Sequence, residues 1–210
     1  MIAIVDYGVG NLFSLKSSFD ALKIPARISA DEDFIRSADK IVLPGVGAFR
    51  DAIGKLKDSG LSGIVVSEAK AGKPLLGICL GMQLLLDKNY EFGEYEGLGL
   101  VPGEVRPLSG YVPGELKIPQ MGWNALRLYG ESPIFKDTKA GEHMYFVHSY
   151  WCDSPEEYVI ASCEYGEEIT AAVQNGNVFG CQFHPEKSGP AGLKILKAFD
   201  EMKGFRKAEK

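Results

Sequence analysis

The sequence has no long apolar run and no excess of basic residues, and each absence excludes a class of protein. Its longest apolar runs are only as long as a strand, and the opening segment 1–5 meets Asp6 without a basic leader, so we expect neither a signal peptide nor a transmembrane span. The formal net charge of -5 offers no positive field to a nucleic-acid backbone or an anionic lipid surface. We therefore expect neither nucleic acid nor a membrane as a partner.

The cysteines show no paired spacing. The four of them, Cys79, Cys152, Cys163 and Cys181, form no C-x-x-C motif, which argues against a zinc site and against a secreted disulfide framework. We expect reduced thiols and a cytoplasmic location.

The length and the apolar content fit one substantial core. With 210 residues and 45% hydrophobic content, the chain is short for two independent enzyme domains. We predict a single domain over residues 1–203, followed by a short charged tail over residues 204–210.

Short Val- and Ile-rich runs alternate with amphipathic stretches over the first ninety residues, a pattern typical of parallel strands joined by crossover helices. Strands are expected at 2–5, around Ile28, at 41–43 and at 75–78, and helices at 12–22 with Asn11 as N-cap, at 49–57 and at 61–71. We predict an α/β fold with an open, mixed, largely parallel sheet flanked by helices.

The second half differs in composition and pattern. Gly and Pro are frequent from Gly93 to Gly114, and the strands expected after them alternate or pair. Residues 174–177 read Gln-Asn-Gly-Asn between two β-rich runs and predict a hairpin with a type I′ turn. An amphipathic helix is expected at 192–203. We therefore predict a more antiparallel second half.

A nucleophile elbow is indicated at residues 77–81, which read Gly-Ile-Cys-Leu-Gly between an apolar strand and a helix-like segment at 82–86. Small residues on both sides of Cys79 allow a sharp strand-to-helix turn that exposes the sulfur, and the following helix N-terminus favours the thiolate. Taken alone, a cysteine in a Gly-rich strand is more often a small buried apolar residue.

His184 and Glu186 follow the second strand of the predicted hairpin, with Pro185 between them. In an extended segment the two side chains lie on the same side, so the carboxylate can orient the imidazole, and the imidazole can move a proton to and from Cys79. An isolated His-x-Glu is more often a solvated pair at a strand end. The combination with the elbow favours catalysis.

A Gly-rich loop at residues 44–49 also follows a strand. Its backbone N–H groups at Gly45, Val46 and Gly47, together with that of Leu80, are suited to stabilise negative charge on an amide oxygen. A phosphate-binding loop is the competing interpretation, but the Gly-Lys-Ser/Thr ending is missing.

Taken together, these segments resemble the class I, triad-type glutamine amidotransferases, whose fold is flavodoxin-like. Within that class the chain is similar to the glutaminase subunits of imidazole glycerol phosphate synthase over nearly its whole length. The segments that carry this similarity are 6–12, 44–49, 121–124, 148–150 and 184–188. Anthranilate synthase glutaminase subunits share the elbow and the His-x-Glu but differ in the opening segment and in the loop before Phe49.

The resemblance implies a catalytic triad of Cys79, His184 and Glu186 that hydrolyses glutamine through a thioester. It further implies substrate contacts at Gln83, Glu91, Ser149 and Tyr150. It also implies a (β/α)8-barrel cyclase subunit as partner, which receives ammonia for histidine synthesis. No cofactor or metal is expected, because both steps are proton transfers around a covalent intermediate.

Met121 and Trp123 are large apolar residues and would be core by default. Because Pro119 and Gly122 flank them, we interpret the segment as an irregular surface loop that docks the partner. Asn11 and Lys187, which lie in segments that carry the resemblance, are the other two predicted interface residues.

Of the remaining histidines, His143 is read as a structural residue in a turn, and His148 is left unassigned. Two further hypotheses stay open: a non-catalytic docking module on the same scaffold, and a free-standing cysteine hydrolase that acts on peptides or γ-glutamyl compounds. Both differ from an ammonia-delivering glutaminase in what they release.

Overall fold

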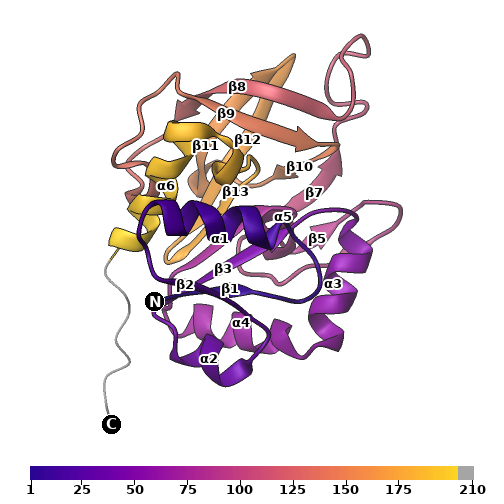
Figure 1. Ribbon diagram of the computed structural model, residues 1–210. Helices are drawn as coiled ribbons and strands as arrows, with labels where there is room; N and C mark the ends of the chain where they lie inside the picture. Colours follow the sequence, from indigo (N-terminus) through magenta and orange to yellow (C-terminus); the bar gives the residue numbers. More distant parts are fainter. Residues whose placement is uncertain (203–210) are drawn as a thin grey trace.

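A nine-stranded sheet forms the centre of the computed structural model, which describes residues 1–202 (Figure 1). The strand order is β2-β1-β3-β4-β13-β12-β11-β8-β9. Pairing is parallel from β2 to β13 and antiparallel from β13 to β9. The strands are β1 (Ile2–Val5), β2 (Ala26–Ser29), β3 (Lys40–Gly45), β4 (Leu75–Cys79), β8 (Gln120–Leu128), β9 (His143–His148), β11 (Val159–Tyr165), β12 (Glu167–Asn175) and β13 (Val178–Cys181). The predicted fold class is confirmed.

A smaller sheet with the order β10-β7-β5-β6 was not predicted. Its strands are β5 (Lys88–Asn89), β6 (Tyr95–Glu96), β7 (Glu104–Pro107) and β10 (Tyr150–Asp153). Two of these strands have only two residues, too few for a period-2 pattern to be visible in the sequence. The sheet brings the segment after Asn89 close to Tyr150. Phe92 of this segment packs edge-on against that tyrosine, with ring centroids 6.4 Å apart.

Helices cover both faces of the parallel half of the large sheet (Figure 1). They are α1 (Leu12–Ala21), α2 (Glu32–Ser37), α3 (Phe49–Asp58), α4 (Leu61–Lys70), α5 (Leu80–Leu85) and α6 (Gly189–Glu201), with 3₁₀ turns at Pro133–Phe135, Glu156–Tyr158 and Pro185–Lys187. Helices α1 and α6 pack on one face, and α2, α3 and α4 on the other. None of these helices is long and apolar enough to cross a membrane.

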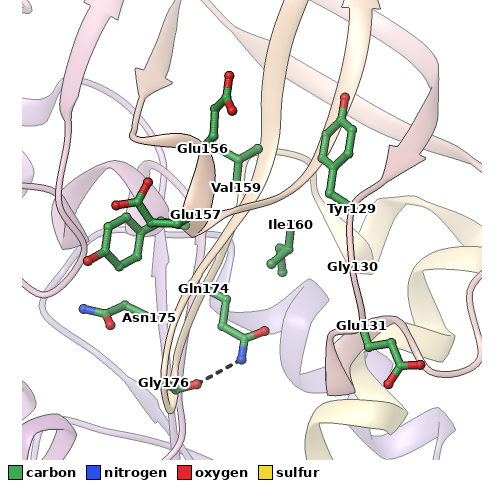
Figure 2. Close-up of a pocket in the computed structure, with 11 residues that line it drawn as sticks. Tyr129, Gly130, Glu131, Glu156, Glu157, Val159, Ile160, Gln174, Asn175 and Gly176 are labelled. Carbon is green, nitrogen blue, oxygen red and sulfur yellow. Dashed lines mark hydrogen bonds between the residues drawn. The ribbon is translucent and has the colours of Figure 1, made fainter.

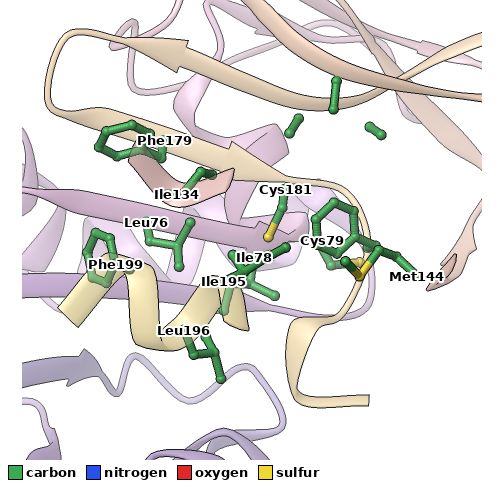
Figure 3. Close-up of a cluster of buried hydrophobic side chains, with 14 of the residues drawn as sticks. Leu76, Ile78, Cys79, Ile134, Met144, Phe179, Cys181, Ile195, Leu196 and Phe199 are labelled. Atoms are coloured by element: carbon green, nitrogen blue, oxygen red, sulfur yellow. The ribbon is translucent and has the colours of Figure 1, made fainter. Parts of the chain in front are cut away.

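Strand β1 shows why the parallel strands are apolar at every position. Ile2 and Ile4 belong to the core cluster under α1 and α6, whereas Ala3 and Val5 belong to the cluster under the other helices. Successive side chains of a strand point to opposite faces, and here both faces are covered. Figure 3 shows part of the first cluster, in which β4 side chains face those of α6.

Several predicted element boundaries differ from the structure. Helix α6 begins at Gly189 and not at Gly192. Asn11 stands at the N-cap position of α1, but its side chain makes no capping hydrogen bond. Helix α2 was not predicted, although Asp31 caps it by accepting a hydrogen bond from the Phe34 N–H at 2.6 Å. Residue 203 of the predicted domain and the predicted tail at 204–210 lie outside the described residues.

The predicted hairpin is present, but the turn type was wrong. Asn175 pairs with Val178, so Gly176 and Asn177 form the two-residue loop. Of these two only Gly176 has a positive φ, of 57°. A type I′ turn needs positive φ at both positions, whereas a type II′ turn needs it only at the first, where glycine is preferred.

Candidate active site

Cys79 lies at a sharp turn between β4 and α5, as the elbow motif predicts. Its backbone has φ 55° and ψ -113°, which is strained for a residue with a side chain. Gly77 and Gly81 make the turn possible: a Cβ on Gly81 would lie 1.9 Å from the Leu43 carbonyl oxygen, and one on Gly77 would lie 2.6 Å from the Gly81 oxygen. The fold therefore tolerates no side chain at either position.

His184 and Glu186 form a buried pair next to this turn. Nδ1 of His184 lies 2.8 Å from Oε1 of Glu186, and each side chain is only 3% exposed. The predicted reason for their alignment was wrong, because Glu186 lies in the 3₁₀ turn Pro185–Lys187 and not in an extended segment. The turn brings the two side chains together, and the bond at Nδ1 leaves Nε2 available for Cys79.

The pKa of His184 is raised to about 9. Burial by itself lowers this pKa, but the hydrogen bonds to Cys79 and Glu186 and the negative charge of both groups outweigh burial. Near neutral pH the imidazole of His184 is therefore protonated. Such an imidazolium holds the proton that a leaving amine needs.

A cavity of about 330 Å³ opens over Cys79 and contains most of the predicted site residues. Its lining consists of Val46, Gly47, Cys79, Leu80, Gln83, Glu91, Pro119, Val147, His148, Ser149, Tyr150, His184 and Lys187. Gly45 and Asn11 do not line this cavity; they line a much smaller one behind it, together with His184 and Glu186. The predicted substrate and oxyanion residues are thus brought together from segments far apart in the chain.

The Gly-rich loop is held at both ends. At its start, Gly45 pairs with Cys79 in the sheet, and the Tyr7 hydroxyl donates to the Pro44 carbonyl oxygen at 2.7 Å. Within the loop Gly47 has φ 89°, a conformation that favours glycine. At its end, the Phe49 N–H donates to Oε2 of Glu91.

Gln83 is anchored by the protein through its amide nitrogen. Nε2 donates to the Tyr150 carbonyl oxygen at 3.2 Å and to Oε1 of Gln182 at 3.0 Å. The pKa of the Tyr150 hydroxyl is raised by burial and by the charge of Glu91, so these two side chains are close enough to interact.

Three residues of the site received no role from the sequence. Gln182 is fully buried and its Nε2 contacts the Cys79 sulfur at 3.7 Å. The Ser188 hydroxyl donates to the His184 carbonyl oxygen at 2.6 Å and accepts from the Tyr145 N–H at 3.0 Å, which joins the 3₁₀ turn to β9. Both residues flank the His-Pro-Glu motif, and this adjacency was the available signal.

His148 is the third residue of the site that received no role from the sequence. Its Nδ1 donates to the Tyr150 carbonyl oxygen at 2.8 Å, so Nε2 is an acceptor, and Nε2 is buried with no hydrogen-bond partner among the described residues. Burial lowers the pKa of His148 to about 4, with a smaller contribution from the charge of His184. His148 is therefore neutral at physiological pH, unlike His184.

Met121 and Trp123 lie in strand β8, which corrects the predicted irregular loop. They are 64% and 53% exposed, so neither belongs to the core. Residues two apart in a strand share a face, and Trp123 packs edge-on against Tyr145 of β9 with centroids 5.9 Å apart. His143, predicted in a turn, is the first residue of β9.

Figure 2 shows another pocket, of about 480 Å³, which Cys79 does not line. Three glutamates, Glu131, Glu156 and Glu157, line it, and none of the predicted site residues does. Nothing among its lining residues provides a nucleophile beside a base, so the candidate active site is the cavity over Cys79.

Residues 3–202 match the model of the class-I glutamine amidotransferase family. Two solved structures share the fold: a glutamine amidotransferase, with a TM-score of 0.73 and 18% identity over 95% of this chain and 97% of that one, and PurLQS from Thermotoga maritima, with a TM-score of 0.72 and 21% identity over 94% and 96%. The chain belongs to the class I glutamine amidotransferase family and is a glutamine-hydrolysing enzyme.

Curated relatives within this family have one subunit name in common. Imidazole glycerol phosphate synthase subunit HisH of Oceanobacillus iheyensis is 47% identical, over 96% of this chain and 99% of its own. The subunit of the same name from Geobacter sulfurreducens is 48% identical over the same two shares.

The opposite pKa shifts of His184 and His148 predict a specific NMR titration. The protein has three histidines, so the imidazole C–H signals can be assigned with His→Gln variants. We expect the His184 signal to titrate near pH 9. The His148 signal should titrate only near pH 4, because this imidazole stays neutral at higher pH. In Cys79→Ala the pKa of His184 should fall, because the negative partner that raises it is gone. An unchanged His184 titration in this variant would contradict the thiolate–imidazolium pair.

Proposed function

We propose that this chain is the glutaminase subunit of an imidazole glycerol phosphate synthase and supplies ammonia for histidine biosynthesis. The observation that carries the proposal is the buried His184–Glu186 pair next to Cys79 at the strained elbow. The high identity to curated relatives over nearly the full length of both chains supports the choice of synthase. Residues 1–203 are proposed to act as one amidotransferase domain, located in the cytoplasm.

In the proposed mechanism the Cys79 thiolate adds to the side-chain carbonyl carbon of glutamine. The oxygen takes up the negative charge and is stabilised by backbone N–H groups. Leu80 is one donor, because the first N–H groups of a helix have no intrahelical acceptor. The Gly45, Val46 and Gly47 peptides are the candidates for the second donor.

Collapse of this intermediate breaks the carbon–nitrogen bond. His184 transfers its proton to the departing nitrogen, so that neutral ammonia leaves and a γ-glutamyl thioester remains on Cys79. His184, now a neutral base, takes a proton from water, which attacks the thioester and releases glutamate and the thiolate. Glu186 stabilises the imidazolium at both stages through its bond to Nδ1.

Glutamine is proposed to lie along the cavity with its amide end at Cys79. Gln83, Ser149 and Tyr150 line the cavity beyond the nucleophile and supply polar contacts. Glu91 provides the negative charge that fits the α-ammonium group. A free amino acid is thus recognised at both ends, which explains why a peptide-bound glutamine is not expected as a substrate.

The proposed partner is a (β/α)8-barrel cyclase that consumes the ammonia. Met121 and Trp123 are exposed side by side on β8, and Lys187 lies at the rim of the catalytic cavity. Asn11, whose side chain does not cap α1, completes the proposed interface. An interface at the mouth of the cavity would deliver ammonia directly, before water protonates it to ammonium, which is no nucleophile.

We expect glutamine hydrolysis to depend on the bound cyclase and on its phosphoribosyl ligand. Glutamate release should be measured for the subunit alone, for the complex, and for the complex with ligand. The ligand-loaded complex should be at least about tenfold faster than the lone subunit, a typical allosteric coupling. Trp123→Ala should reduce the stimulation, while Tyr129→Ala, which removes a partly exposed aromatic residue directly after the end of the same strand, should not. Full activity in the lone subunit would refute the coupling.

A further inference from the structure

Glu91 caps a helix that is distant in the sequence. Oε2 accepts a hydrogen bond from the N–H of Phe49, the first residue of α3. The N-cap residue of that helix is Ala48, which has no side chain able to cap it. A carboxylate at a helix N-terminus makes a charge-assisted hydrogen bond and is favoured by the helix dipole. Glu91 therefore fixes the position where α3 begins.

The residues directly before this helix start form the Gly-rich loop. Val46 and Gly47 line the catalytic cavity, and Gly45 pairs with Cys79. The loop thus runs from the end of β3, which pairs with the nucleophile strand β4, to the N–H that Glu91 holds. A Cβ at Gly47 would meet nothing within 4 Å, and its φ is positive, so the peptide units beside this glycine can rotate easily. The bond from Phe49 to Glu91 is the anchor at this end of the loop.

The position of Glu91 is itself built by its neighbours. Its N–H donates to Oδ1 of the fully buried Asn89 at 2.6 Å. The next residue, Phe92, has a φ of 55° and packs its ring edge-on against Tyr150. A backbone conformation of this kind persists only where its surroundings enforce it. The carboxylate is therefore placed between the cavity and the helix start.

We propose that Glu91 couples recognition of the substrate α-ammonium group to the geometry of the oxyanion loop. One carboxylate oxygen holds the Phe49 N–H, and the other faces the cavity and pairs with the ammonium group. When the loop shifts and the Phe49 bond breaks, the carboxylate loses the contact that fixes its position. Binding of the ammonium group therefore favours the loop arrangement in which oxyanion donors are in place. Glu91 is thus a positioning residue for the loop as well as a substrate contact, an inference that rests on the proposed glutaminase function.

The test compares two substrates and two variants in the ligand-loaded complex with the cyclase. Glutamine has the α-ammonium group, and glutaramate, its analogue without the α-amino group, does not. Glu91→Gln keeps an oxygen that can accept from the Phe49 N–H but removes the charge. Glu91→Ala removes both. Glu96→Ala, which removes an exposed glutamate from the nearby strand β6, is the matched control.

We expect Glu91→Gln to raise the KM for glutamine about tenfold and to keep kcat within about threefold for both glutamine and glutaramate, because the amide oxygen still accepts from the Phe49 N–H but without the charge. We expect Glu91→Ala to lower kcat about tenfold for both substrates relative to Glu91→Gln, because the loop loses its anchor. The control should match the wild type. Equal kcat values of the Gln and Ala variants on glutaramate would overturn the loop role. An unchanged KM for glutamine in Glu91→Gln would overturn the substrate contact. Absence of glutamate release by the wild-type complex would instead contradict the proposed function.

Discussion

Replacing Cys79 with alanine is expected to lower glutamate release by at least about a thousandfold, because in the proposed mechanism the sulfur forms the covalent bond on which both half-reactions depend. The fold should survive. Alanine removes one buried atom and leaves the strained elbow between Gly77 and Gly81 unchanged. Turnover in the ligand-loaded complex and the thermal unfolding curve are the two measurements. Cys181→Ala, which removes a buried thiol from the neighbouring strand β13, should keep most of the activity.

Chemical labelling gives an independent check on the nucleophile. A diazo-ketone analogue of glutamine should modify Cys79 alone, because only this sulfur lines the cavity. Burial raises the pKa of the other thiols: of Cys163 to about 11, and of Cys152 and Cys181 further above the usual value. These three thiols should be neutral and unreactive. Equal modification of any of them, detected by mass spectrometry, would count against the assigned mechanism.

His184→Ala is expected to reduce turnover nearly as much as Cys79→Ala, because it removes the group that, in the proposed mechanism, gives a proton to the departing nitrogen and then takes one from water. Glu186→Gln should reduce turnover less than His184→Ala does, with a loss that is smaller by about tenfold or more. In the proposed mechanism Glu186 orients the imidazole without forming or breaking bonds. The amide oxygen of the side chain introduced at position 186 can still accept a hydrogen bond from Nδ1 of His184. Glutamate release by the cyclase complex at saturating glutamine is the measurement.

The double variant Cys79→Ala/His184→Ala serves as the control for this comparison. Residues that act as a unit are not additive, so the double variant should be no slower than Cys79→Ala alone. If Glu186→Gln lost as much activity as His184→Ala, the carboxylate would have a larger role than orientation. The pKa of His184 in Glu186→Gln should also fall, because the charge of Glu186 helps to raise it.

Local sequence was sufficient to predict the nucleophile elbow at Cys79. A strand, a turn and a helix that follow one another in the chain need only small residues at fixed offsets, and Gly77 and Gly81 provide these around Cys79. The parallel half of the sheet was predictable for the same reason, because strands buried on both faces are apolar at each position. The pairing order of the strands was not contained in any single segment.

Errors arose where tertiary contacts set the local conformation. The segment from His184 to Glu186 was expected to be extended, but Ser188 and Tyr145 hold it as a 3₁₀ turn against β9. Met121 and Trp123 were placed in a loop because of the nearby proline and glycine, although pairing with β9 keeps them in a strand.

The sequence by itself determined the class of the fold, and it predicted the nucleophile elbow and the His-x-Glu pair, because each depends on residue types at fixed short spacings. Only the tertiary structure decided which distant groups complete the site. Glu91 meets the start of α3, and His148 and Gln182 reach the cavity or the Cys79 sulfur, through strand pairing and packing that no local pattern encodes. The pKa values of His184 and His148 differ in opposite directions for the same reason. Both are buried histidines near the carboxyl end of a strand. Cys79 and Glu186 outweigh burial at His184 and raise its pKa, whereas at His148 burial outweighs the hydrogen bond to the Tyr150 carbonyl oxygen and lowers the pKa.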